Sequence, residues 1–186
     1  FDGIVNIDES ITAYTGDSVV INAAMTTTGD LDFNALNGVQ VQAAVSANNI
    51  TAIADADLSA VDNFGLLVPD GIGTVLFGAG GSLSGVNIEV ASGGSLALGD
   101  IPATGTLDIT TTADEITQLG GTDITATGLT TVDVGAGGAN ILLGVTTNDF
   151  SSVTVVNAGA NDVDVYDVNA ITFSGDANTL DVRGTD

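Results

Sequence analysis

One pattern is written twice between Leu129 and Val165, and it strongly restricts the folds open to this chain. The run Leu129–Val134 (LTTVDV) is followed at an offset of 21 by Phe150–Val155 (FSSVTV). The tripeptide Gly-Ala-Asn at 138–140 recurs at 159–161 with the same offset. Short alternating runs separated by Gly and Asn, with a period near 20, are typical of the coils of a β-solenoid.

The repeated letters predict how buried side chains stack from coil to coil. Aligning the two copies places Val132 on Val153 and Val134 on Val155. The side chains at these positions alternate with polar ones, so they face the inside of the coil.

Asparagine recurs at the same point of three coils, after the small Gly and Ala residues. Asn tolerates the left-handed turn conformation and can bond to a copy of itself above and below. A structural ladder at one corner is therefore predicted from Asn140, Asn161 and Asn178.

The N-terminal part has nearly the same period but a different amino-acid sequence. Val19 begins a run that recurs from Val39, at an offset of 20. Ile11, Leu31 and Ile50 begin three further runs with steps of 20 and 19 residues. We therefore expect Ile11, Leu31 and Ile50 to stack in one file and Val19 to stack on Val39.

These periods predict one architecture for residues 1–186. It is all-β: a single-stranded, right-handed parallel β-helix, or β-solenoid, with about 20 residues in each of about nine coils. The stretch 61–81 is less regular and contains the turn signal Pro69-Asp70-Gly71, so a loop or a widened coil is expected there.

Charge excludes several classes of partner. The sequence has 24 acidic residues and one basic residue, Arg183, for a formal net charge of −23, and it has no His. Such a surface repels phosphate backbones and anionic lipid headgroups, so neither nucleic acid nor a membrane surface is expected as a partner. The sequence also has no run of about 18 apolar residues, so no membrane insertion is expected.

Composition also argues against catalysis. With no Cys and no His, the chain lacks a cysteine nucleophile and the commonest general base. Some enzymes on β-helices use paired carboxylates, and Asp pairs are present here. The long loops that carry such active sites are missing from the sequence, however. We expect no enzyme activity and no required cofactor.

One acidic cluster is a candidate calcium site. Asp162 and Asp164 alternate with valines, so both face outward from one strand, and Asp167 follows at the turn. Calcium prefers oxygen ligands of this kind. The alternative is an acidic outer face that fixes no ion, and the sequence leaves both open.

The segments 148–155 (NDFSSVTV) and 163–171 (VDVYDVNAI) resemble repeats of filamentous-haemagglutinin-like bacterial surface proteins, as do 107–112 and 116–121. The resemblance implies a right-handed parallel β-helix that is secreted or held at the bacterial cell surface, where it serves as an adhesin or builds a filament. The implied partners are copies of the chain, further coils, or cell-surface glycans and proteins.

Two alternatives remain. The segments 135–143 and 157–165 resemble degenerate calcium-binding nonapeptides of RTX and S-layer proteins, which implies an S-layer or matrix protein with a calcium-bridged acidic surface. Their spacing of about 21 does not fit the tandem repeats of that family. The other alternative is a β-sandwich pilus subunit completed by a donated strand, with Phe1–Glu9 as the donor.

Overall fold

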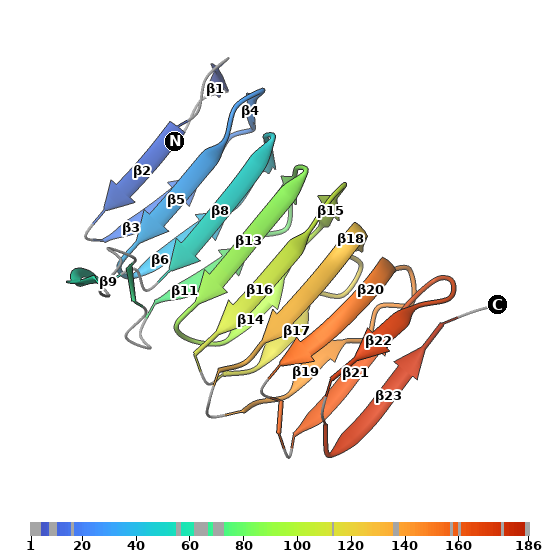
Figure 1. The fold of residues 1–186 in the computed structure, drawn as a ribbon. Coiled ribbons are helices and arrows are strands. Elements are labelled where there is room, and N and C mark those ends of the chain that lie inside the picture. Colours follow the sequence, from blue (N-terminus) through green and yellow to red (C-terminus); the bar gives the residue numbers. More distant parts are fainter. Residues whose placement is uncertain are drawn as a thin grey trace.

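The computed structural model describes residues 5–7, 11–15, 17–54, 57–61, 67–68, 73–112, 114–135, 138–156, 158–159, 161–175 and 177–184. Within these ranges every regular element is a strand, and none is a helix. All but two of the strands form two large sheets and one four-stranded sheet that face one another as the sides of a rod (Figure 1).

The sheet nearest the viewer in Figure 1, here called the front sheet, has nine strands. In stacking order these are β2 (Ile11–Thr15), β5 (Leu31–Ala35), β8 (Asn49–Ala54), β13 (Asn87–Ser92), β16 (Leu107–Thr111), β18 (Ile124–Asp133), β20 (Asp149–Val156) and β22 (Thr172–Ser174), with β15 (Ile101–Ala103) beside β18.

The back sheet has eight strands. They are β3 (Ser18–Ile21), β6 (Gly38–Val41), β11 (Thr74–Phe77), β14 (Leu96–Leu98), β17 (Ile116–Gln118), β19 (Ile141–Leu143), β21 (Asp162–Tyr166) and β23 (Thr179–Arg183). A four-stranded third sheet closes the N-terminal part with β1 (Val5–Ile7), β4 (Met25–Thr27), β7 (Ala44–Ser46) and β12 (Ser82–Ser84).

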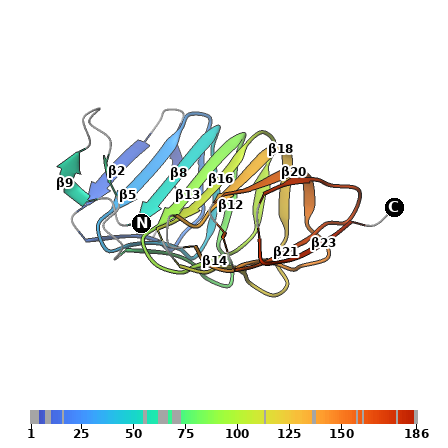
Figure 2. The same cartoon turned by 60° about the horizontal axis from the view of Figure 1, so that its bottom comes forward.

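Neighbouring strands in these three sheets are parallel, as a solenoid requires. In Figure 1 the front strands run toward the lower left, while successive coils advance from upper left to lower right, and the back strands return behind them. This is a right-handed winding, and Figure 2 shows the same rod from another side. The predicted parallel β-solenoid is confirmed. The β-sandwich on which the pilus alternative depends is not the fold.

The core lies between the sheets and is made by the alternating apolar positions. Phe33 and Phe150 are fully buried and mark the two halves of the rod. The predicted file of Ile11, Leu31 and Ile50 is confirmed, because two successive coils of 20 and 19 residues bring these positions into register. Val19 likewise pairs with Val39.

The predicted stacking in the doubled stretch is wrong by two residues. Val153 pairs with Thr130, and Val155 pairs with Val132. Both Val132 and Val134 are nevertheless buried, as are Val153 and Val155. A shift of two residues leaves every side chain on its original face, so alternation alone cannot distinguish the two registers.

The coils are fewer and longer than the nine that were predicted. The largest step in the front sheet joins Ile50 to Ile88, and it contains an antiparallel pair, β9 (Asp57–Val61) and β10 (Leu67–Val68). The chain rejoins the back sheet at β11, which pairs with β6. The less regular stretch predicted at 61–81 lies partly outside the described residues.

The cross-section of the rod changes along its length. In the N-terminal part each coil has a separate strand on the third side. Further along, Ile101 of β15 pairs with Ile124 at the start of β18, while Leu107 of β16 pairs with Thr130 near its end. The single strand β18 therefore spans two sides that were separate before, and the rod becomes two-sided.

Candidate functional site

The outward side chains of the front sheet form one continuous file. In strand order it contains Thr12, Asp32, Thr51, Glu89, Asp108, Thr131, Thr154 and Ser174. Its three carboxyl groups are those of Asp32, Glu89 and Asp108, and we call the whole file the acidic file.

Glu89 lies at the centre of the acidic file, beside a shallow depression of about 140 Å³. The depression is also lined by Asn49, Thr51, Asn87 and Asp108. Glu89 is exposed on its strand, but desolvation beside the depression raises its pKa, and the neighbouring carboxylates of Asp108 and then Asp32 raise it further. The group therefore holds its proton more tightly than an ordinary glutamate does.

A polar ladder borders this depression at the corner before each front strand. The Asn49 amide donates to Asp30 Oδ1 at 2.7 Å, and the Asn87 amide donates to Asn49 Oδ1 at 2.9 Å. Asn87 Oδ1 then accepts from both the backbone N–H and the hydroxyl of Thr106. The corner ladder, defined as Asp30, Asn49, Asn87 and Thr106, was not predicted. Its sequence signal is a polar residue directly before each buried strand.

The three asparagines of the predicted ladder lie at the start of the back-sheet strands. The Asn140 amide donates to Glu115 Oε1 at 3.4 Å, and its oxygen accepts from the Asp162 backbone N–H at 3.0 Å. The Asn161 amide donates to the carbonyl of Ala158 in its own turn. Asn178 is joined to Asn161 through the backbone. These bonds use Glu115 and backbone groups as partners, and none of them joins one of the three side-chain amides to the next.

The three carboxylates of the predicted calcium site do not share one surface: two point to solvent and one is buried. Asp162 and Asp164 point outward from β21, in alternation with buried valines. Asp167 is buried, and its two oxygens accept from the backbone N–H groups of Phe150 and Asn169. Among the described residues no group of three or more acidic side chains is placed to hold a metal ion. Through these two hydrogen bonds Asp167 connects the start of β20 to the turn that follows β21.

The outward file of the back sheet differs from the acidic file. In strand order it contains Val20, Gln40, Leu76, Ala97, Thr117 and Leu142, and it continues into Asp164 and Asp181. The first six side chains carry no charge, and we call them the neutral file. Leu76, near its centre, is 45% exposed.

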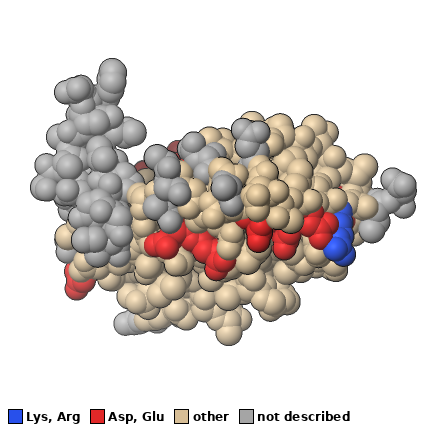
Figure 3. All heavy atoms as spheres, turned by 90° about the horizontal axis from the view of Figure 1, so that it is seen from below, with Lys and Arg blue, Asp and Glu red and all other residues tan. Residues whose placement is uncertain are grey.

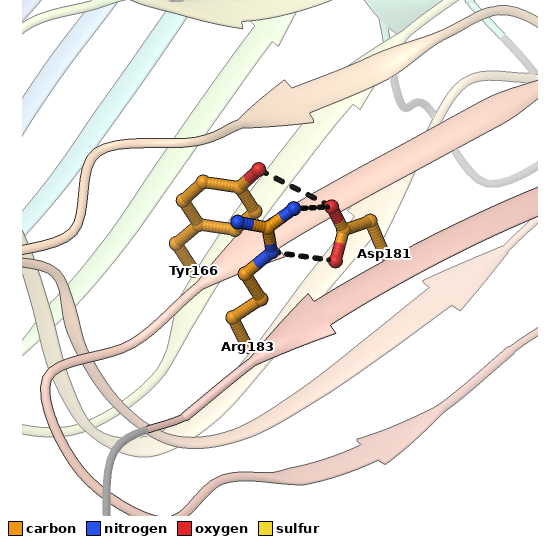
Figure 4. A network of polar contacts seen from close by, with 3 residues as sticks. All are labelled: Tyr166, Asp181 and Arg183. Carbon is orange, nitrogen blue, oxygen red and sulfur yellow. Dashed lines mark hydrogen bonds and ion pairs between the residues drawn. The ribbon is translucent and has the colours of Figure 1, made fainter.

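A small polar cluster holds the last coil. The Arg183 guanidinium makes two hydrogen bonds to the Asp181 carboxylate, at 2.9 and 2.6 Å, and lies 4.8 Å from the centre of the Tyr166 ring (Figure 4). The Tyr166 hydroxyl donates to the same carboxylate at 3.2 Å. The hydrogen bonds from Arg183 lower the pKa of Asp181.

The last coil leaves its apolar side chains open to solvent. Leu180 of β23 is 51% exposed, although its register partner Val163 is fully buried. Phe173 and Val182 are only partly buried against the core. β22 and β23 are the outermost strands of the front and back sheets at this end.

Acidic side chains also form a row along the rod, which ends beside Arg183 (Figure 3).

No helix within the described ranges is long and apolar enough to cross a membrane.

Comparison with protein families gives one match. Residues 85–157 match a family described as repeats of unknown function (DUF5649). No curated protein matches the chain, and no solved structure matches it. The matched segment runs from β13 to β20, so it covers the coils in which the rod changes from three sides to two. The middle of this β-solenoid is thus similar to a known class of protein repeats.

Proposed function

We propose that the chain is a rigid structural or adhesive segment of a bacterial extracellular surface protein or fibre, and that it joins further coils end to end. The observation that carries this proposal is the stack of parallel coils in the front and back sheets, in which each coil offers apolar side chains and strand edges to the next one. The acidic surface fits an extracellular setting, because a large net charge keeps an extended rod soluble. Its lateral surfaces are proposed to bind cell-surface glycans or proteins.

The outermost described coil shows two physical reasons why a further coil, of the same chain or of another copy, would join it. Leu180, Phe173 and Val182 occupy inward positions that are buried in the coils below, so another coil would remove their apolar surface from water. The outermost strands β22 and β23 also present unpaired backbone groups on one side, and such edges pair readily with a further strand.

The proposal is tested by the self-association of the 186-residue chain. We expect species of increasing length in sedimentation velocity as the concentration rises. Leu180→Asp puts a charge on the stacking surface and should lower the association constant at least tenfold. Thr179→Asp is the matched control, since it adds the same charge to the same strand on its outward side.

Circular dichroism should show an unchanged β-sheet spectrum for both variants, so that lost association is not lost folding. Equal association of the native chain and Leu180→Asp would contradict the proposal, as would equal losses in both variants.

A further inference from the structure

The neutral file is unusual for this molecule. The chain has a net charge of −23, yet six neighbouring strands of the back sheet, from β3 to β19, present uncharged side chains in one row. Isolated apolar residues on a surface need no explanation, but here four apolar side chains share one row with Gln40 and Thr117 and with no charge between them. This face is where another acidic molecule can approach with the least repulsion.

The order of the side chains within the file is self-complementary. Reading from β3 to β19, Val20 is apolar, Gln40 polar, Leu76 and Ala97 apolar, Thr117 polar and Leu142 apolar. This pattern of polarity reads the same from either end. A two-fold axis through the midpoint between Leu76 and Ala97 therefore brings apolar residues onto apolar ones and polar residues onto polar ones.

We propose that the back sheet is a lateral docking face for a second copy of this chain, through two-fold pairing of the neutral files. In this arrangement Leu76 of one copy lies over Ala97 of the other, and Val20 lies over Leu142. Gln40 lies over Thr117, so its amide has a hydroxyl to bond. Two-fold pairing of identical patches is the commonest way in which soluble proteins associate.

The charges beyond the neutral file favour this alignment over a parallel one. Asp164 and Asp181 continue the row after Leu142. In the two-fold arrangement they extend past Val20 of the other copy, whereas a parallel arrangement would place each carboxylate over its own copy. Asp181 is paired with Arg183, but in the parallel arrangement the two Asp164 carboxylates would oppose each other directly and repel, so the antiparallel alignment is selected.

The expected association is weak. Six strands span five steps of about 4.8 Å, or about 24 Å. A single row of side chains of this length buries less area than the roughly 800 Å² per partner of a standard interface. Salt should strengthen the pairing, because it screens the repulsion between two acidic chains. This proposal is independent of the end-to-end joining, which uses other strands and leads to other species.

The first test compares two charge substitutions by sedimentation equilibrium. Leu76→Asp places carboxylates near the two-fold axis and should lower the dimerisation constant at least tenfold. Thr131→Asp is the matched control: it adds the same charge at an outward position of a central strand in the front sheet, and should leave dimerisation unchanged. Equal losses in both variants would show general repulsion and overturn the proposal.

The second test fixes the alignment by cross-linking. The chain has no native cysteine, so the double variant Val20→Cys/Leu142→Cys can be treated with a short thiol-specific cross-linker. Within one chain these positions are about 24 Å apart, too far for the reagent, so only the two-fold pair yields a covalent dimer. Either single variant should give none.

A chain that stays monomeric in high salt, or a double variant that does not cross-link, would overturn the proposal. Longer covalent ladders that disappear in Leu180→Asp would assign the contact to end-to-end joining instead.

Discussion

The N-terminal and C-terminal parts of the rod bury similar side chains but turn their corners differently. In the three-sided N-terminal part, Asn49 and Asn87 sit at the corner before the front strands and bond to the coils on either side. In the two-sided part the register positions that follow the corner ladder are occupied by Leu129 and Ser152. There β18 and β20 each continue through the corner as one strand, with a register shift between Ala126 and Leu129.

This difference shows what the alternating pattern does and does not determine. Inward apolar residues decide which face of a strand is buried, and they do so equally well in both parts. Where the chain bends is decided by residues such as Asn87, whose side chain satisfies the backbone N–H groups of the turn. The corner ladder is therefore the feature that separates the two parts of this solenoid.

The largest expected effect comes from truncating the core in each part. Phe33→Ala and Phe150→Ala each remove a fully buried ring and should cost about 3–5 kcal/mol of unfolding free energy. Because coils contact mainly their neighbours, the damage should stay local. Hydrogen exchange should increase around β3–β6 in the first variant and around β18–β21 in the second. Uniform loss of protection in both would show that the parts are not separable.

A smaller effect is expected at the corner itself. Asn87→Ala removes one amide bond and leaves the Thr106 backbone N–H without its acceptor, which should cost about 1–3 kcal/mol. Ser152→Ala is the matched control in the same file of the two-sided part, and this partly exposed substitution should stay within about 0.5 kcal/mol. Urea denaturation of both variants measures the difference. Equal values would remove the corner ladder as the cause of the change in shape.

One substitution should stabilise the two-sided part. The hydroxyl of Thr130 is fully buried between Leu107 and Val153 and has no hydrogen-bond partner. Thr130→Val removes this unsatisfied group and should raise the unfolding free energy by about 1 kcal/mol.

Thr111→Val serves as the control for this prediction. Thr111 is equally buried, but its hydroxyl donates to the carbonyl of Asp114 at 2.7 Å, so the same change should destabilise the chain. Thermal unfolding of the two variants should therefore shift in opposite directions. A shift in the same direction would mean that hydroxyl pairing does not decide the outcome.

The smallest effect concerns the acidic file of the three-sided part. Because the pKa of Glu89 is raised in the folded chain, folding favours its protonated form. This contribution to stability is complete below the ordinary carboxyl pKa and is lost as the pH rises through the raised value. Glu89→Gln should thus be more stable than the native chain at neutral pH, with no advantage in acid. Asp108→Asn, measured in parallel by pH-dependent denaturation, should recover part of that gain.

Much of the fold could be predicted from residues whose spacing is regular. Ile11, Leu31 and Ile50 stack as expected, because nothing is inserted between their coils. The register of Val153 was missed, because coil length depends on the corners and not on the repeated letters. The third sheet was missed as well, since strands of three residues such as β4 are too short to show alternation.

The candidate surfaces were less predictable than the fold. The outward direction of Asp162 and Asp164 follows from alternation, but the buried position of Asp167 does not, because it depends on the N–H groups of Phe150 and Asn169. The neutral file is also invisible in the sequence. Its members are separated by coils of unequal length, and only the three-dimensional register places them side by side.

The most direct test of the account is a distance along the acidic file. Thr12 and Thr154 are six strand steps apart in a continuous register, which corresponds to about 29 Å. Spin labels at Thr12→Cys and Thr154→Cys, measured by pulsed electron resonance, should give one narrow distribution near that value. A broad distribution, or a distance below about 20 Å, would contradict a single rod of parallel coils.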